Sequence, residues 1–242
     1  MPKKSTLPLD TVPVEAVHRV ELLRELPPGE LLIHEIYASI QGESTFAGLP
    51  CVFVRTAVCD LRCSWCDSPY AFHEGGKMSI DEIVAEVTRH SCDLVEMTGG
   101  EPLLQKALYP LMDRLHEAGL QVLIETGGHR SIEHVPTYAT VIMDVKCPGS
   151  GEAARHDAGN FARLRAHDEV KFVIRDRVDY EYARHVLARE QLSGRVAGVL
   201  FSPVHGALTP KTLSEWVLAD HLKVRVQLQA HKYIWGADVR GV

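Results

Sequence analysis

The chain has 242 residues, of which 45% are hydrophobic, and a formal net charge of −6 at pH 7. This length suits one domain with an ample core, and the mild acidity excludes the basic surface that non-specific nucleic-acid binding requires. No run of about 18 apolar residues predicts a membrane span, and no charged-then-apolar leader predicts export. We therefore expect a cytoplasmic protein with no membrane or direct nucleic-acid partner, whose six cysteines are reduced.

The first thirty residues are expected to form an extension to the main domain, which would run from 31 to 242. Within the extension, Val14–Leu26 has the spacing of a short amphipathic helix, and the Pro-Pro-Gly sequence that follows would end it. Leu31–Ile40 is predicted to be extended and to run into the polar segment Gln41–Ser44. A glycine between two hydrogen-bonding side chains suits a turn that brings backbone close to a polar ligand. A plain surface turn is the alternative.

Cys51–Val58 is apolar enough to be an inner parallel strand, and it contains one charged residue, Arg55. A charge inside a buried strand costs several kcal/mol unless it is paired. Arg55 is therefore expected either to meet an internal carboxylate or to face a cavity and bind an anionic group of a substrate.

Three thiols follow this strand within eight residues, at Cys59, Cys63 and Cys66. A structural zinc site normally needs four ligands, and no second close pair of ligands follows. A disulfide would leave one thiol over, and three unrelated packing cysteines would not be expected in so charged a loop. An iron-sulfur cluster held by three thiolates leaves one iron without a protein ligand, which indicates that a small molecule binds there.

Downstream of the thiols, helix and strand patterns alternate. Ser79–Glu82 is a capping box that opens a helix with an apolar stripe. The predicted strands are Leu94–Thr98, Leu120–Thr126, Thr140–Lys146, Glu169–Ile174, Gly198–Ser202 and Val224–Gln229, and the later helices are Leu104–Leu115, Tyr180–Arg189 and Thr209–His221. This alternation predicts an α/β fold with a parallel sheet and outer helices. About six parallel strands are too few for a closed barrel, so we expect an incomplete TIM-type barrel.

Polar residues gather where the predicted strands end. Besides the cysteine loop, they are Thr98–Glu101, Glu125–Thr126, Asp144–Lys146, Ser202–His205 and Gln229–His231. Because the carboxyl ends of parallel strands meet at one end of the sheet, we expect a single functional site there. Within it, Gly99-Gly100-Glu101 would offer bare backbone to an amino-acid-like ligand and a carboxylate to an ammonium group.

The CxxxCxxC segment with an aromatic residue before its last cysteine, followed one β-α unit later by GGE, resembles the radical S-adenosylmethionine (SAM) superfamily. The resemblance implies a 4Fe-4S cluster on Cys59, Cys63 and Cys66, whose open iron binds the amino and carboxylate groups of SAM. It implies reductive cleavage of SAM to a 5'-deoxyadenosyl radical that takes a hydrogen atom from the substrate. The implied SAM-binding residues are Trp65, Asp67, Gly99, Gly100, Glu101, Asp144, Val145, Lys146, Phe201, Ser202, Pro203 and Val204.

Further segments narrow the resemblance to the 7-carboxy-7-deazaguanine synthase family. They are Ser39–Glu43, Phe53–Arg55, Cys59–Asp67, Thr98–Gln105, Asp144–Lys146, Lys171–Val173, Ser202–Pro203 and Gln229–Tyr233. The resemblance implies a carbon-nitrogen lyase of queuosine biosynthesis that converts 6-carboxy-5,6,7,8-tetrahydropterin to 7-carboxy-7-deazaguanine with loss of ammonia. The implied substrate-binding residues are Ile40, Gln41, Gly42, Glu43, Arg55, Thr98, Gln229 and His231.

The same resemblance implies a Mg²⁺ ion with Ser68 as its protein ligand, a homodimer, and an external electron donor such as flavodoxin. No catalytic side chain is implied beyond the cluster and SAM. The chain departs from the usual family pattern at four positions: Ser44 and Val58 replace glycines, Asp60 replaces asparagine, and Ser68 replaces threonine. Serine keeps the ligand oxygen, whereas Ser44 and Val58 bear on local turn geometry.

Two other functions fit parts of the pattern. A radical SAM activase that forms a glycyl radical on a protein partner would need an open docking groove rather than an enclosed polar pocket. A zinc-bearing RNA-binding module would contain zinc in place of iron and sulfide.

Overall fold

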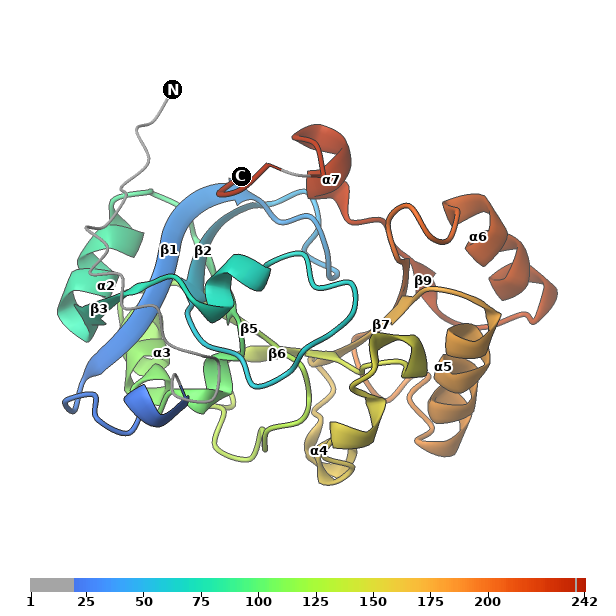
Figure 1. Cartoon of the computed structure of the whole chain (residues 1–242), viewed down its shortest axis with the longest axis horizontal. Coiled ribbons are helices and arrows are strands. Elements are labelled where there is room, and N and C mark those ends of the chain that lie inside the picture. Colours follow the sequence, from blue (N-terminus) through green and yellow to red (C-terminus); the bar gives the residue numbers. More distant parts are fainter. Residues whose placement is uncertain (1–19, 238) are drawn as a thin grey trace.

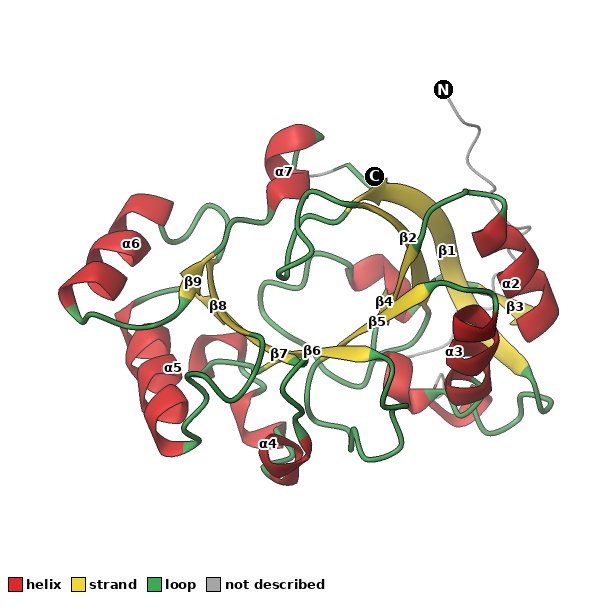
Figure 2. Cartoon of the chain, turned by 180° about the vertical axis from the view of Figure 1, so that it is seen from behind, coloured by secondary structure: helices red, strands yellow, loops and turns green. Residues whose placement is uncertain are grey.

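The computed structural model describes residues 20–237 and 239–242. One curved sheet runs through this part of the chain, in the strand order β3-β1-β2-β4-β5-β6-β7-β8-β9 (Figures 1 and 2). The strands are β1 (Glu30–Ile40), β2 (Pro50–Thr56), β3 (Gly76–Ser79), β4 (Leu94–Gly99), β5 (Gln121–Thr126), β6 (Thr140–Asp144), β7 (Glu169–Ile174), β8 (Gly198–Pro203) and β9 (Arg225–Val226). Because the edge strands β3 and β9 do not pair with each other, the sheet forms an incomplete barrel.

Seven strands, β2 and β4 to β9, pair in parallel, which confirms the predicted α/β architecture. The helices lie mainly along the outer side of the curved sheet (Figure 2). They are α2 (Ile80–Thr88), α3 (Leu108–Glu117), α4 (Gly159–Arg163), α5 (Arg177–Arg189), α6 (Pro210–Ala219) and α7 (Ala230–Ile234), with short 3₁₀ turns at Pro69–Phe72, Pro102–Leu104, Pro148–Ser150 and Ala153–Arg155. The predicted strand Val224–Gln229 pairs only at Arg225 and Val226, so β9 is a short edge strand.

Two antiparallel strands extend the sheet beyond the predicted architecture. β1 pairs antiparallel with β2, where Tyr37 lies opposite Phe53 and their rings stack at 5.2 Å. β3 pairs antiparallel with β1. β3 was not predicted, because Gly-Lys-Met-Ser contains a single apolar side chain and therefore shows no alternation.

The loop that follows β1 bridges distant parts of the open barrel. Glu169, at the start of β7, accepts hydrogen bonds from the backbone N–H of Thr45 at 3.0 and 3.1 Å. Gln227, just after β9, accepts from the backbone N–H of Ser44 at 2.8 Å and donates to its carbonyl at 2.6 Å. This loop thus reaches the interior of the barrel even though β1 runs antiparallel to its neighbours.

The main core lies between the sheet and the outer helices, and the capping box at the start of α2 is confirmed. Ser79 accepts from the backbone N–H of Glu82 at 3.3 Å, and Glu82 accepts from the N–H of Ser79 at 2.8 Å. Helix α3 begins at Leu108 rather than at the predicted Leu104. The segment before it is held in another conformation, because the Gln105 side chain bonds to the backbone of β1 and of the residue after β2.

The predicted helix Val14–Leu26 lies mostly outside the described residues, within which residues 20–22 are helical. Within residues 20–237 and 239–242, no helix is both long enough and apolar enough to cross a lipid bilayer.

Candidate active site

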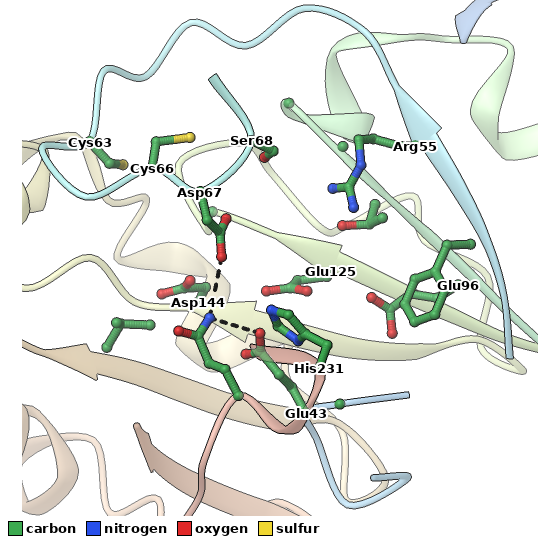
Figure 3. A pocket seen from close by; sticks show the side chains of 18 of the residues that line it. Glu43, Arg55, Cys63, Cys66, Asp67, Ser68, Glu96, Glu125, Asp144 and His231 are labelled. Carbon is green, nitrogen blue, oxygen red and sulfur yellow. Dashed lines mark hydrogen bonds between the residues drawn. The ribbon is translucent and has the colours of Figure 1, made fainter. Parts of the chain in front are cut away.

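A cavity of about 270 Å³ opens inside the barrel, and residues from most strand ends line it (Figure 3). Twenty of the predicted site residues lie on its wall: Ile40, Gln41, Gly42, Glu43, Arg55, Cys59, Cys63, Trp65, Cys66, Asp67, Ser68, Thr98, Gly99, Gly100, Glu101, Asp144, Lys146, Val204, Gln229 and His231. The structure therefore brings together the cysteine loop, the GGE turn and the Gln-Gly-Glu turn around one space.

Four residues predicted to contact SAM do not line this cavity. Val145 and Phe201 are fully buried in the main core. Ser202 is also buried, and Pro203 lines a neighbouring hollow beside α6. Their contact with SAM stays a prediction.

The cysteine loop is partly enclosed, and several contacts fix its course. Cys59 is only 8% exposed, whereas Cys63 and Cys66 are partly exposed. Burial raises the pKa of the Cys59 thiol to about 12, and it also raises the pKa of Cys63 and of Cys66. All cysteines of the described residues are free thiols, so the structure contains no disulfide there.

One carboxylate next to the first cysteine anchors this loop to the rest of the barrel. Asp60 contacts His129 Nε2 at 2.7 Å and Arg155 Nη2 at 2.7 Å, and it also pairs with Arg130. The residue replaces the asparagine of the family pattern. The three basic partners explain why a carboxylate is stable at this position. Burial opposes its charge, but His129 and Arg130 hold the pKa of Asp60 well below its usual range.

The GGE turn packs so tightly against the start of the cysteine loop that it requires glycine. Gly99 has a φ of 141°, and a Cβ atom there would lie 2.3 Å from the carbonyl oxygen of Thr56. A Cβ atom on Gly100 would lie 2.2 Å from the carbonyl oxygen of Val58. The backbone of this turn therefore borders the cavity without side chains, as the sequence predicts.

The carboxylate of Glu101 has partners within the chain itself. It accepts from the backbone N–H of Leu103 at 3.0 Å, from Thr126 Oγ1 at 2.8 Å and from the N–H of Gly127 at 2.9 Å. These bonds join the GGE turn to the end of β5. Glu101 thus stabilises the turn and also lines the cavity, and its predicted contact with an ammonium group stays a prediction.

A buried lysine organises the charged part of the cavity. Lys171 Nζ lies 2.8 Å from Glu43 and 3.6 Å from Asp144, and it also contacts Glu125. Burial alone would lower the pKa of Lys171, but the three carboxylates outweigh it and raise the pKa well above the usual value. Glu125 was expected at this end of the sheet without an assigned role, and Lys171 was given no role in the site, although a lysine in a largely apolar strand is the same kind of signal that singled out Arg55.

Arg55 meets an internal carboxylate and also faces the cavity, whereas its contact with an anionic substrate group stays a prediction. Its Nε donates to Glu35 at 2.8 Å and its Nη2 donates to the Tyr37 hydroxyl at 2.9 Å. Its side chain also lines the cavity, and Figure 3 shows the guanidinium near Glu96 and Glu125. A guanidinium has five N–H donors, so donors remain for a ligand after these two bonds.

The Gln-Gly-Glu turn and helix α7 form one wall of the cavity. Gln229 Nε2 donates to Glu43 at 3.0 Å and Lys232 Nζ lies 3.3 Å from Asp67. A Cβ atom on Gly42 would lie 2.7 Å from His231 Nδ1, so only glycine allows this close approach. The wall thus joins segments that are almost 190 residues apart in sequence.

Glu96, on β4, was missed by the sequence analysis, yet it is almost fully buried in the cavity wall. It accepts a hydrogen bond from Gln41 Nε2, whose Oε1 in turn accepts from the N–H of Glu43 at 2.6 Å. Burial raises the pKa of Glu96 well above its usual value, and the nearby charge of Glu125 raises it further. As for Arg55, the sequence feature that could have indicated Glu96 is a single charged residue in a largely apolar strand.

The raised pKa of Glu96 predicts a pH-dependent stability. A carboxyl group with a raised folded-state pKa stabilises the fold in acid, and this contribution is lost as the pH rises from the unfolded-state value toward the folded-state value. Glu96→Gln keeps the acceptor for Gln41 without the ionisation, so its melting temperature should exceed that of the parent by a margin that grows with pH. Thermal unfolding of the metal-free protein over a pH series measures this margin. Glu215→Gln, on the exposed face of α6, is the matched control and should show no growing margin.

The comparisons with known proteins agree with this geometry. The model of the radical SAM superfamily matches residues 53–145. A 7-carboxy-7-deazaguanine synthase from Koribacter versatilis is 49% identical over 224 residues, which cover 87% of this chain and 99% of that protein. One from Chlorobaculum tepidum is 44% identical over 215 residues, which cover 88% of this chain and 97% of that protein.

A solved structure supports the same fold. The crystal structure of QueE from Escherichia coli matches with a TM-score of 0.71 at 22% identity, and the match covers 90% of this chain and 99% of that chain. The incomplete barrel, the CxxxCxxC loop at its mouth and the superfamily match define a radical SAM enzyme. On the identity to its relatives, the chain belongs to the 7-carboxy-7-deazaguanine synthase family. The activase and the zinc-bearing RNA module are therefore not favoured.

Two departures from the family pattern coincide with unusual backbone. Ser44 has a φ of 63° and Val58 a φ of 76°, which is the left-handed region that favours glycine. At both positions this chain therefore holds a conformation that glycine adopts without strain.

Proposed function

We propose that this protein converts 6-carboxy-5,6,7,8-tetrahydropterin to 7-carboxy-7-deazaguanine with loss of ammonia, in queuosine biosynthesis. The observation that carries the proposal is that the cysteine loop, the bare GGE turn and a set of buried charged groups line one concave cavity of about 270 Å³. A concave polar pocket suits a small polar substrate.

The cofactors follow from the superfamily, and the residues on the cavity wall fit them. Cys59, Cys63 and Cys66 border the cavity, and no single metal ion could be held by the three thiols together, because no group of three potential ligands converges within the described residues. A 4Fe-4S cluster does not need such convergence, since each thiolate binds a different iron. When bound, the cluster and SAM supply the radical chemistry that removes a hydrogen atom from the substrate.

The SAM-binding assignment rests on the wall opposite Cys63. Asp144 Oδ2 is bonded to Lys146 at 2.9 Å, but its Oδ1 is buried without any hydrogen-bond partner. A buried carboxylate oxygen needs a donor, and the hydroxyl or amino groups of SAM would supply one. Gly99 and Gly100 lie on the wall of the same cavity, where their backbone would face the ligand.

The substrate would occupy the part of the cavity between β2, β4 and α7. The remaining donors of Arg55 would bind the pterin carboxylate, because a bidentate guanidinium matches that group. Gln41 and His231 would bind the polar edge of the ring system, together with the buried carboxyl group of Glu96. Gln41 is already fixed by Glu96 and the N–H of Glu43, so its amide is oriented before the substrate arrives.

Ser68 is proposed as the protein ligand of Mg²⁺. The residue is buried at the start of the 3₁₀ turn Pro69–Phe72, and its hydroxyl makes no capping hydrogen bond there. One hydroxyl cannot hold Mg²⁺ alone, so the substrate carboxylate and waters would complete the octahedral shell.

Ser68→Ala is expected to raise the Mg²⁺ concentration for half-maximal activity by roughly tenfold, because the only protein oxygen in that shell is lost. Mg²⁺ titrations of the rate of product formation measure the change. Ser68→Thr, which keeps the hydroxyl, is the matched control and should titrate like the parent. An alanine variant that also titrates like the parent would show that this hydroxyl does not bind the metal.

The proposed activity is tested by anaerobic incubation of the iron-reconstituted protein with SAM, dithionite, Mg²⁺ and the carboxytetrahydropterin. Mass spectrometry should detect 7-carboxy-7-deazaguanine and one equivalent of ammonia. Cleavage of SAM without the deazapurine would support the superfamily chemistry and refute this substrate.

Further proposals concern the surroundings of the enzyme. Residues 31–242 would form the catalytic domain, residues 1–30 an extension, and two chains a homodimer in the cytoplasm. An external one-electron donor such as flavodoxin would reduce the cluster, because no residue of the cavity can supply an electron at the potential that clusters of this kind require.

A further inference from the structure

The cysteine loop begins at a residue with a strained backbone. Val58 has a φ of 76°, where a β-branched side chain crowds its own carbonyl group. The backbone at this point is nevertheless fixed on both sides: the N–H of Val58 donates to Ala71 at 2.8 Å, and its carbonyl accepts from the N–H of Glu101 at 2.9 Å. These two bonds thus join Val58, at the start of the cysteine loop, both to the segment after that loop and to the GGE turn.

A small apolar cluster, separate from the main core, surrounds the side chain of Val58. It consists of Leu32, Ala57 and Val58, all almost fully buried. The residues packed against it include three from the segment before β1: Val20, Leu23 and Leu26. We call residues 20–26 the brace segment. It is the dark blue turn at the lower edge of Figure 1, next to α3.

Hydrogen bonds hold the polar backbone around this cluster. Gln105 donates to the carbonyls of Leu32 at 2.9 Å and Ala57 at 3.0 Å, and it accepts from the N–H of Leu32 at 2.8 Å. This buried amide joins β1, the residue before Val58 and the segment after the GGE turn. Leu104, from the turn after Gly99-Gly100-Glu101, also packs against the cluster, and the brace segment supplies the other three partly buried apolar side chains.

We propose that the brace segment is a positioning element for the cluster-binding loop: it keeps the side chain of Val58 buried and thereby holds its strained backbone, which sets Cys59 against the GGE turn. A strained conformation persists only where the surroundings over-determine it. If the brace is loosened, Val58 can leave the left-handed region, and the bond from Glu101 to its carbonyl is lost with it. The inference rests on the proposed cluster but not on the identity of the substrate.

The test uses the full-length, iron-reconstituted protein with Leu23→Ala and Leu26→Ala combined. Loosening the loop should expose the cluster more often, so its visible absorbance should bleach in air about five times faster than in the parent. Iron retained after desalting and the electron paramagnetic resonance signal of the reduced protein give a second and third readout. Leu222→Ala, which trims a partly buried leucine packed on the main core beside α6, is the matched control and should change bleaching by less than about twofold.

A second background distinguishes bracing from a general loss of stability. Val58→Gly removes the steric strain, so the two leucine substitutions should change bleaching by less than about twofold when added to it. Equal acceleration with and without Val58→Gly would overturn the proposal, as would no acceleration in the parent background. A parent protein that binds no iron refutes the cluster assignment and this inference together, whereas one that binds iron but forms no deazapurine refutes the substrate alone.

Discussion

Cys63→Ala should abolish formation of the deazapurine and leave no activity above background. Cys63 is the middle thiol of CxxxCxxC and borders the cavity together with Cys59 and Cys66. Only two thiolates would remain, so two irons of the cluster would have no protein ligand. Such a cluster should not be retained, and SAM would then have no iron to bind. Anaerobic assays by mass spectrometry measure the loss of product, and iron analysis of the same sample measures the loss of the cluster.

A cysteine outside the cavity supplies the control for this variant. Cys92 is a partly buried free thiol that packs against the main core. Cys92→Ala should therefore keep the iron content and the activity of the parent. Full activity in Cys63→Ala, or equal loss in both variants, would contradict the assignment of the three cluster ligands.

Lys171→Met is expected to lower the free energy of unfolding of the metal-free protein by about 3–5 kcal/mol, the cost of leaving buried charges without their partner. Three carboxylates, those of Glu43, Glu125 and Asp144, surround this lysine, and its side chain is only 4% exposed. Chemical denaturation measures the change. Lys211→Met is the matched control, because Lys211 pairs with Glu215 on the surface of α6 and is 81% exposed. It should cost less than about 1 kcal/mol.

The loss in Lys171→Met should depend on pH in a defined direction. Without the lysine, Glu43 and Glu125 lose the charge that most lowers their pKa values, and burial should raise the pKa of both, whereas Asp144 keeps its bond to Lys146. Groups with raised folded-state pKa values contribute stability in acid and lose it as the pH rises. The variant should therefore be closest to the parent near about pH 5 and furthest from it near about pH 8. A deficit that is constant over this range would show that the carboxylates find other cations.

The sequence predicted much of the barrel because its strands and helices have clear periods. Both predicted ends of the strand Glu169–Ile174 agree with those of β7. Every position of this strand is buried, and charged residues mark its two ends. The edges were predicted less well. β3 has one apolar side chain, and β9 pairs over two residues although the apolar pattern is longer, because pairing at an edge depends on the neighbouring strand and not on local sequence.

Site residues that belong to a recognisable motif were predicted, whereas the roles of isolated site residues were missed. The cysteine loop and the GGE turn have fixed spacings that can be recognised in one sequence. Glu96 belongs to no motif, and Lys171 stands in a family segment that assigns it no role. The role of each depends on which strands the fold places side by side. Glu101 shows the converse: the motif is present, but the fold gives its carboxylate partners on β5 that the sequence cannot reveal.

The wall built from the Gln-Gly-Glu turn and α7 has a consequence for the order in which the protein folds. The N–H of Ala230 donates to the carbonyl of Gly42 at 2.9 Å, a contact that closes a loop of almost the whole chain. Contacts between residues so far apart form late, because the entropy of loop closure must first be overcome. During synthesis the cavity would therefore lack this wall until α7 has emerged and docked. Until then the Gln-Gly-Glu turn has no partner from the end of the chain, and the space for small molecules stays open on that side.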